Sequence, residues 1–543
     1  MTKRFTVIFF IVLGIIALLM TGFVLVLFLA PGFSAFGVRY IALNTRNYDS
    51  GEIRLIDEVG AFTGDIEINA KEVPIYVYFT QANGGGNAYK VRYYENFSGF
   101  TKSKIEDPSI EITKRNGVVV ININEYEKFI FQNANTKKFV NLYIPMENIS
   151  GTGAGRTNLT INTKSSSIVF DRELPQSEED LRVPSFKNVT INGNGNIKYN
   201  VEMRAITYSL STNNSILITD DKLSSFNAVN YKLNSNKGKI EIKREVSGDL
   251  YCTTKNGKIT FLTCKNFVGE TTYGDIYCSD NSKQTELAGI VKITTKTGNI
   301  TLGNVNGTGD NEIVSGSGNV KIKKIKDGSI ETKRGSVQIN SVNKMKITTN
   351  MGKVNVEEAL TSIDVSTKRG RINLGGENMV VNNPKVFSRL GRVNVTSALG
   401  EVYIETVSSD VVFNNKSSEN ITIYAGGKLT ATALTGKINI TANQNTTLDF
   451  AKITDNATIK MGKNCKSLLI KAYDDAYGDT RFIISGKMST IYEDDPTDDV
   501  DPYKMVSGEQ LTNKKDGTGA LLDVTAANAN IDVYFKVTNT EED

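Results

Sequence analysis

A short phrase led by glycine recurs through the middle of the chain and constrains its fold more than any other feature. The phrase places apolar residues at alternate positions, as in Gly238-Lys-Ile-Glu-Ile242 and Gly298-Asn-Ile-Thr-Leu302. It begins again at Gly257, Gly274, Gly318, Gly335, Gly352, Gly370, Gly391 and Gly436. Successive glycines from 238 to 391 are 17 to 24 residues apart, and a second strand phrase such as Met345-Lys-Ile-Thr-Thr349 falls between them. Each repeat is therefore predicted to hold two short strands.

The phrase has a direct physical interpretation. Apolar residues two positions apart point to the same side of a strand, while the polar residues between them face water. We expect the glycine to adopt a turn conformation with positive φ that other residues resist. One repeat cannot bury its apolar side alone, but stacked repeats bury a continuous column, which predicts an all-β, parallel β-solenoid (β-helix). An antiparallel sandwich also uses alternating strands, but the regular glycine spacing favours the solenoid.

The N-terminus carries a different signal, an uncharged apolar run. Residues 5–30 hold no charged side chain, and Lys3 and Arg4 precede them. A helix of this length is long enough to cross a hydrocarbon core of about 30 Å. The positive-inside rule then predicts a cytoplasmic N-terminus and an extracellular remainder. The alternative is a cleaved signal peptide, but its apolar region is expected to be shorter, and Ala35-Phe36-Gly37 is a weak cleavage candidate.

These patterns divide the chain into five predicted parts. Residues 1–4 form a cytoplasmic stub, and residues 5–30 form one N-terminal transmembrane α-helix. Residues 38–139 are a β-rich region, and residues 140–480 contain the β-solenoid repeats. Residues 481–543 contain an acidic loop and a strand, Ala529–Val537, that is expected to cap the end of the stack.

The repeated phrases resemble those of the bacterial "putative adhesin" family of solenoid ectodomains. The resemblance includes an opening strand, Gly64-Asp-Ile-Glu-Ile68, and a Leu-x-[Ile/Val]-Pro phrase, Leu142-Tyr-Ile-Pro145. It covers roughly residues 60 to 480 and implies a β-solenoid behind a single membrane helix and attachment at a surface. The resemblance implies no catalytic residues. The chain is longer than the family pattern and departs from it at residues 165–230 and 400–435.

Two features of composition bear on chemistry. The chain has no histidine, which excludes Ser-His-Asp and Cys-His catalysis and zinc sites that need imidazole. Its four cysteines, Cys252, Cys264, Cys278 and Cys465, form no CxxC pair, so they are expected to be small core residues, with a disulfide among the first three as the alternative. We predict no enzyme activity, no cofactor and no metal site. Lysine and carboxylate chemistry stays open.

Basic residues precede several of the repeat glycines. If the repeat glycines occupy equivalent positions, these basic residues lie on one edge of the stack. They are Lys255, Lys296, Lys333, Arg334, Lys368 and Arg369. Such an edge could bind polyanions by multivalent contacts. Charged turns also keep sheet edges soluble, which is the more common reason for them. The acidic run from Glu493 to Asp501 is expected to be a solvated loop, because it lacks the spacing of a calcium-binding loop.

Together these features predict a non-catalytic, membrane-anchored, single-pass surface protein. Its expected partners are membrane lipid through residues 5–30 and an envelope polymer, glycan or surface protein through the solenoid face. No nucleic-acid partner is expected, because 63 basic and 59 acidic residues nearly balance. The alternatives are a carbohydrate-active β-helix enzyme, such as a polysaccharide lyase or hydrolase, and an envelope scaffold protein.

Overall fold

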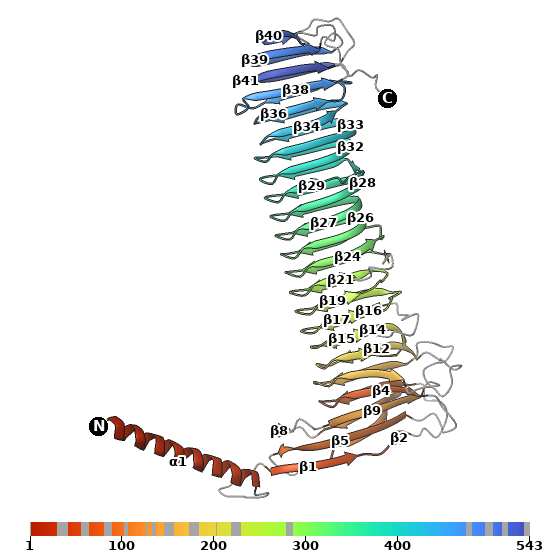
Figure 1. Cartoon of the computed structure of the whole chain (residues 1–543). Coiled ribbons are helices and arrows are strands. Elements are labelled where there is room, and N and C mark those ends of the chain that lie inside the picture. The colour runs from red at the N-terminus through yellow and green to blue at the C-terminus, as the bar shows by residue number, and fades with distance from the viewer. Residues whose placement is uncertain are drawn as a thin grey trace, which may run out of the picture. The chain divides into compact units, whose positions relative to one another are not determined.

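The computed structural model is built mainly from parallel β-strands (Figure 1). It describes residues 2–29, 42–55, 64–80, 89–101, 107–125, 129–132, 137–145, 157–172, 184–201, 203–218, 230–278, 286–473, 480–494, 503–512 and 520–536. Strands make up 68% of the structure, and the described residues contain one helix. The chain divides into two compact units, residues 1–247 and residues 248–543.

Helix α1 spans Thr2–Leu29, where the sequence predicts a helix. The side chains described in it are those of residues 9–22, and the large apolar ones among them are exposed, from Ile16 at 48% to Leu18 at 76%. When only the described residues are counted, no helix is both long enough and apolar enough to cross a membrane. The structure thus supports a helix at this place but does not support the prediction that it spans a membrane.

The first unit contains α1 and seventeen strands. They are β1 (Ala42–Asp49), β2 (Ile53–Leu55), β3 (Asp65–Ala70), β4 (Ile75–Thr80), β5 (Tyr89–Thr101), β6 (Ser109–Arg115), β7 (Val118–Asn124), β8 (Phe129–Gln132), β9 (Lys137–Pro145), β10 (Asn158–Thr163), β11 (Ile168–Arg172), β12 (Ser185–Asn192), β13 (Ile197–Tyr199), β14 (Arg204–Thr212), β15 (Ile216–Ile218), β16 (Asn230–Ser235) and β17 (Ile240–Ile242). One parallel series runs β7, β3, β10, β12, β14 and β16, and a second runs β9, β4, β11, β13, β15 and β17. Antiparallel pairs of β5 with β1, β2, β8 and β9, and of β6 with β7, lie at the beginning of this unit.

A carboxylate fixes the turn between β3 and β4. One oxygen of Glu125 accepts hydrogen bonds from the backbone amides of Lys71, Glu72 and Val73 at 3.0, 2.7 and 2.9 Å. Its other oxygen lies 2.9 Å from the ammonium group of Lys138. Three converging amides and one cation satisfy the charge of a side chain that is only 2% exposed.

The second unit contains the remaining strands. They are β18 (Asp249–Thr254), β19 (Ile259–Phe261), β20 (Phe267–Thr271), β21 (Ile276–Cys278), β22 (Glu286–Leu287), β23 (Val291–Thr295), β24 (Ile300–Val305), β25 (Glu312–Ser315), β26 (Val320–Thr332), β27 (Val337–Thr349), β28 (Val354–Thr367), β29 (Ile372–Leu374), β30 (Val381–Asn382), β31 (Pro384–Ser388), β32 (Val393–Thr406), β33 (Val411–Ala425), β34 (Leu429–Leu434), β35 (Lys437–Ala442), β36 (Thr446–Phe450), β37 (Ala457–Met461), β38 (Ser467–Tyr473), β39 (Arg481–Asp494), β40 (Tyr503–Thr512) and β41 (Leu521–Lys536).

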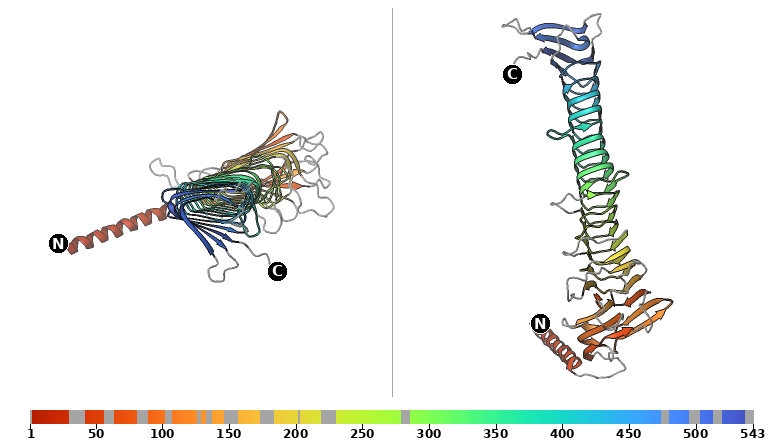
Figure 2. Two further views of the ribbon diagram at one scale, coloured as in Figure 1. Left: turned by 90° about the horizontal axis from the view of Figure 1, so that it is seen from above. Right: turned by 90° about the vertical axis from the view of Figure 1, so that its right-hand side faces the viewer.

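These strands stack in parallel on strands of the next repeat, except β40, which pairs with β39 in the antiparallel direction. β18, β20, β23 and β25 form one series, and β19, β21 and β24 form the other. Both series enter the long strand β26, which pairs with β27, and β27 pairs with β28. Figure 2 shows the layers of this unit following one another. We call each layer, from one glycine-led turn to the next, a rung and name it by its glycine.

The apolar residues of the repeated phrase form the buried columns that the sequence predicts. Ile259 pairs with Ile276, which pairs with Ile300, and the column continues through Val320 and Val337. All five side chains are at most 1% exposed, while the residues between them along each strand are more exposed. Burial of this column follows from the alternation of apolar and polar residues in each strand.

The role of the repeat glycines differs from the predicted one. The glycines with positive φ are elsewhere, apart from Gly436, so Gly335, Gly352 and Gly370 do not need the left-handed conformation. A Cβ atom added to Gly352 would instead collide with the carbonyl oxygen of Gly335, and one added to Gly370 would collide with that of Gly352. The same contact joins Gly274, Gly298, Gly318 and Gly391 to the preceding repeat glycine. Glycine is required because successive turns approach too closely for a side chain.

A buried hydroxyl accompanies each of these turns. Thr349 is 1% exposed, and its hydroxyl accepts a hydrogen bond from the amide of Gly352 at 3.0 Å. Thr367 and Gly370 repeat the arrangement one rung later, at 2.8 Å. The same bond is present at Thr254, Thr271, Thr295 and Ser388. The hydroxyl therefore satisfies an amide that the tight turn would otherwise leave buried without a partner.

The four cysteines are free and buried, which confirms their prediction as core residues and excludes the disulfide alternative. Burial raises the pKa of the Cys252, Cys264 and Cys465 thiols. The C-terminal strand predicted at residues 529–537 belongs to β41, which lies parallel to β37, β38 and β39. Most of the acidic run from Glu493 to Asp501, residues 495–501, lies outside the described residues.

Candidate functional site

The turns before and after the repeat glycines lie in register along one edge of the second unit. In the Gly370 rung the amide of Lys368 donates to Thr349 at 3.3 Å, and the amide of Arg369 donates to Asn350 at 2.9 Å. The next rung repeats these bonds, from Arg389 to Thr367 and from Leu390 to Lys368. Equivalent turn residues of neighbouring rungs are therefore about 4.8 Å apart along the stack.

This register decides which of the predicted basic residues lie together. Lys255, Lys296, Lys333 and Lys368 occupy the first turn position, each two rungs from the next, with Thr272, Gly316 and Asn350 between them. Arg334 and Arg369 occupy the second turn position, also two rungs apart. All six predicted residues are exposed. Lys333, Arg334, Lys368 and Arg369 share a short stretch of the edge, and Lys255 and Lys296 lie further along the same row.

The structure adds basic residues that follow the glycine. The carbonyl oxygens of Lys353, Arg371 and Arg392 accept hydrogen bonds of 2.8, 2.9 and 2.9 Å from the amides of the preceding rungs. The donors are Val337, Val354 and Ile372, respectively, which puts the three basic residues at one position of three successive rungs. Arg389 extends the first turn position by a further rung. The basic residues predicted from the sequence all precede a repeat glycine, whereas Lys353, Arg371 and Arg392 directly follow one.

Several other rungs place a linking side chain where these three cations stand. The carboxylate of Asp275 accepts a 2.7 Å hydrogen bond from the amide of Asn299 in the next rung. The side-chain oxygen of Asn299 accepts from Asn319, and that of Asn319 accepts from Ser336, both at 2.9 Å. Asp410 resumes the pattern with a 2.9 Å bond from Lys428. Lys353, Arg371 and Arg392 interrupt this chain of links with side chains that cannot accept a hydrogen bond.

We define the basic cluster as Lys333, Arg334, Lys353, Lys368, Arg369, Arg371, Arg389 and Arg392. The four turns that hold it contain no acidic residue. Within the part of the chain that the structure describes, none of these eight side chains forms an ion pair. Four rungs span about 14 Å, so the cluster is a dense patch of unpaired positive charge.

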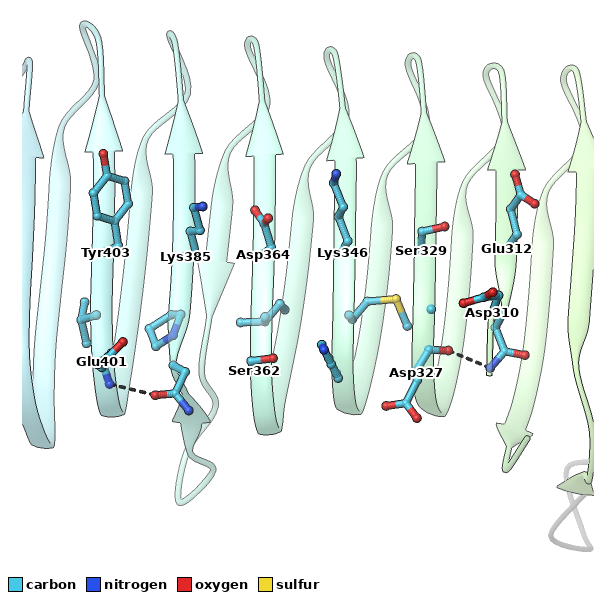
Figure 3. Close-up of a pocket in the computed structure, with 18 of the residues that line it drawn as sticks. Asp310, Glu312, Asp327, Ser329, Lys346, Ser362, Asp364, Lys385, Glu401 and Tyr403 are labelled. Carbon is cyan, nitrogen blue, oxygen red and sulfur yellow. Dashed lines mark hydrogen bonds between the residues drawn. The ribbon is translucent and has the colours of Figure 1, made fainter. Parts of the chain in front are cut away.

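A groove runs along a different part of the same unit, and Figure 3 shows its walls. It has a volume of about 1170 Å³ and crosses seven successive rungs, from residues 309–312 to residues 420–422. One wall carries Glu312, Ser329, Lys346, Asp364, Lys385, Tyr403 and Thr422, each Cα-paired with the next. The other wall carries Asp310, Asp327, Lys344, Ser362, Asn383, Glu401 and Asn420. No sequence motif predicts this groove.

Opposite charges are neighbours in the groove, but they do not pair. Lys346 lies between Ser329 and Asp364, and Asp364 is followed by Lys385. The described residues contain no ion pair among these three charged side chains. Figure 3 shows the three side chains in one row on neighbouring strands, and those of Lys346 and Lys385 are exposed.

Comparisons with known proteins give little information about this chain. No family model matches it, and no curated protein matches it. One solved structure, described as a "putative cell adhesion protein" from Clostridium sporogenes, aligns with 54% of this chain and 99% of its own length. Its sequence identity is 8% and its TM-score is 0.19, so this distant neighbour carries no argument about function.

Proposed function

We propose that the chain is a non-catalytic surface protein whose basic cluster binds an anionic envelope polymer. The observation that carries the proposal is the stacking of Lys353, Arg371 and Arg392 at one position of three successive rungs. Like charges about 4.8 Å apart on neighbouring strands repel one another and destabilise the fold. Asparagine at this position would instead link two rungs, as Asn299 and Asn319 do. A ligand that compensates the repulsion explains why cations stand there.

A polymer fits the cluster better than a small anion. Eight cations spread over four rungs offer several weak contacts at once, and such contacts multiply when the anions belong to one chain. Arginine guanidinium groups also bind carboxylates and phosphates in a bidentate manner. Because the cluster is exposed to solvent, its affinity is expected to fall steeply as salt is added. Acidic turns would keep the edge soluble equally well. The four turns of the cluster contain no acidic residue, so solubility alone does not explain its composition.

We also propose that the stack is a β-solenoid carried outside the cell by an N-terminal membrane helix. The solenoid is supported by the regular parallel pairing of each strand with the strand one repeat later. The anchor is supported by the uncharged run at residues 5–30 and by the exposed apolar side chains of α1, such as Phe10 and Leu19. Apolar side chains on all sides of a helix are typical of a helix surrounded by lipid or protein.

The test of polymer binding compares two charge-reversed variants of the full-length chain in detergent. The first carries Lys333→Glu, Arg334→Glu, Lys368→Glu and Arg369→Glu. The second carries Lys323→Glu, Lys324→Glu, Lys416→Glu and Lys452→Glu, exposed residues outside the cluster. Both variants change the net charge equally. Binding to immobilised polyphosphate and polygalacturonate is measured by surface plasmon resonance.

The first variant is expected to lose at least tenfold in affinity, and the second is expected to retain the affinity of the unmodified chain. Equal losses in the two variants would show that only net charge matters and would reject the cluster as a site. Failure of the unmodified chain to bind either polymer would reject the proposed function. Protease treatment of intact cells tests the location separately, because an external chain is cut before lysis and an internal one only after it.

A further inference from the structure

We propose that the groove of the second unit is a second binding site, which takes an uncharged, hydroxyl-rich oligosaccharide chain. The proposal goes beyond polyanion binding and uses none of the basic cluster. It is based on three observations: an extended groove, polar side chains along both walls, and exposed aromatic rings beside one end. Ligand sites commonly combine such aromatic surface with a few polar groups that fix orientation.

The groove has the form that an extended chain requires. It crosses seven rungs, so its length is about 29 Å. Its floor is formed by Met345, Ile363, Pro384 and Val402, and these residues are buried. Hydroxyl, ammonium and carboxylate groups follow one another along the wall from rung to rung, as at Ser329, Lys346 and Asp364 (Figure 3). A polymer that lies along the groove can therefore form hydrogen bonds with each rung that it passes.

The aromatic rings lie where the groove approaches its C-terminal end. Tyr403 forms part of one wall, and the ring of Tyr424 in the next rung is 6.0 Å from it, centroid to centroid. Phe387 lies two residues beyond Lys385 on β31 and is 37% exposed, and Tyr424 is 38% exposed. Exposed rings on adjacent strands present flat apolar faces to solvent. The C–H groups of a sugar ring pack on such faces, and its hydroxyl groups reach the polar walls.

We call the rings of Phe387, Tyr403 and Tyr424 the platform. A carboxylate that lies between them orients one of these rings. Glu405 is Cα-paired with Phe387 on one side and Tyr424 on the other. It accepts a 2.7 Å hydrogen bond from the hydroxyl of Tyr403. This bond raises the pKa of Tyr403, so the phenol stays neutral at physiological pH. The bond thereby holds the half-buried ring of Tyr403 in one orientation.

The charge of the groove indicates an uncharged ligand. Its lining contains five carboxylates, Asp310, Glu312, Asp327, Asp364 and Glu401, and three ammonium groups, Lys344, Lys346 and Lys385, which gives a net charge of −2. A polyanion is repelled by this balance and favours the basic cluster instead. Carboxylates and ammonium groups together provide both acceptors and donors, which suits hydroxyl groups because each hydroxyl both donates and accepts.

The absence of tryptophan from the chain allows a direct test. Tyr403→Trp introduces a single tryptophan at the platform, and Tyr273→Trp introduces one at an exposed tyrosine of the turn edge, away from the groove. The full-length variants, in detergent, are titrated with cellohexaose, chitohexaose and mannohexaose, and with polyphosphate as the charged comparison. At least one neutral hexasaccharide is expected to shift the emission of Tyr403→Trp to shorter wavelength and to leave that of Tyr273→Trp unchanged.

Two further variants separate the groove from the basic cluster. Ser362→Arg places a long side chain across the groove, and Tyr403→Ala removes one platform ring; each is expected to lower affinity for the hexasaccharide about tenfold, measured by calorimetry. Both are expected to retain polyphosphate binding. Ser317→Arg, at an exposed turn outside the groove, is the control and retains binding of the hexasaccharide.

The proposal is overturned if none of the three hexasaccharides binds the unmodified chain. It is also overturned if Ser362→Arg and Tyr403→Ala bind as well as the Ser317→Arg control. Loss of hexasaccharide binding in the cluster variant Lys333→Glu, Arg334→Glu, Lys368→Glu and Arg369→Glu would place the site at the cluster and reject the groove. Failure of polyphosphate binding alone rejects the proposed function and leaves this inference standing.

Discussion

Arg371 and Arg392 occupy the same position of successive rungs, held in register by a 2.9 Å hydrogen bond from the amide of Ile372 to the carbonyl oxygen of Arg392. Neither guanidinium group has an acidic partner among the described residues. The arrangement costs stability, because it replaces a linking side chain with two charges that repel each other. Stability and binding are therefore opposed at this position.

Arg371→Asn is expected to stabilise the protein while weakening its hold on polyanions. The new side-chain oxygen can accept a hydrogen bond from the amide of Arg392, as Asn299 accepts one from Asn319. One such bond contributes about 0.5–1.5 kcal/mol. Urea denaturation should therefore show a higher midpoint, and polyphosphate affinity should fall. A lower midpoint, or unchanged affinity, would contradict this account of the cluster. Asn319→Lys is the reverse change and should lower the midpoint.

Gly352→Ala is expected to destabilise the stack by about 3 kcal/mol or more, because the added methyl group meets a backbone carbonyl that cannot rotate away. Gly376→Ala is the matched control, since the nearest atoms to a Cβ there are side-chain carbons of Met379 and Glu357 at 3.4 and 3.5 Å. Thermal unfolding followed by circular dichroism compares the two. Similar melting temperatures for both variants would show that the turns can separate, contrary to the structure.

Thr349→Val keeps the volume of the side chain but removes the hydroxyl that accepts the amide of Gly352 at 3.0 Å. The amide is then buried without a partner, which costs about 1–3 kcal/mol. Thr349→Ser retains the hydroxyl and removes only a methyl group, so its loss should be smaller. The order of urea midpoints should be unmodified chain, then Thr349→Ser, then Thr349→Val. Equal midpoints for the two variants would mean that the hydroxyl is not needed.

The thiols are expected to resist alkylation in the folded chain. Burial disfavours the thiolate and raises the pKa of Cys252, Cys264 and Cys465, so little of the reactive form is present at pH 8. Iodoacetamide should modify the native chain slowly and all four cysteines rapidly in urea, as measured by mass spectrometry. Rapid modification of Cys252 in the native chain would contradict its place in the core.

The strands were predictable because their signal is local. In Ile259-Thr-Phe261 and Ile276-Tyr-Cys278 the alternation alone assigns the buried side of each strand, and the structure confirms it. The function of Gly352 was not predictable in the same way. Its sequence position indicates a turn, but the reason for glycine is the distance to Gly335 in another rung, which no local pattern reports.

The candidate sites were predictable only in part, for the same reason. Lys333 and Arg369 are predictable because they precede glycines in a repeated phrase. Arg371 follows its glycine, at a position where other repeats hold Asp275, Asn299 or Asn319, so no shared residue type marks it. The groove combines single residues from rungs far apart in the chain, such as Glu312 and Tyr403. Its residues share no motif, and only the register of the strands brings them into line.

The contact between each repeat glycine and the one before it also governs how such a chain can change over generations. A rung such as residues 335–351 contacts the preceding rung in the same way as the following rung contacts it. A duplication or loss of its whole coding segment therefore leaves every remaining pair in register. Loss of one residue within a strand moves every later side chain of that strand to the opposite face. Gain or loss of a whole rung is therefore tolerated where insertion of a single residue is not. The distance between two sites on the stack changes in steps of one rung.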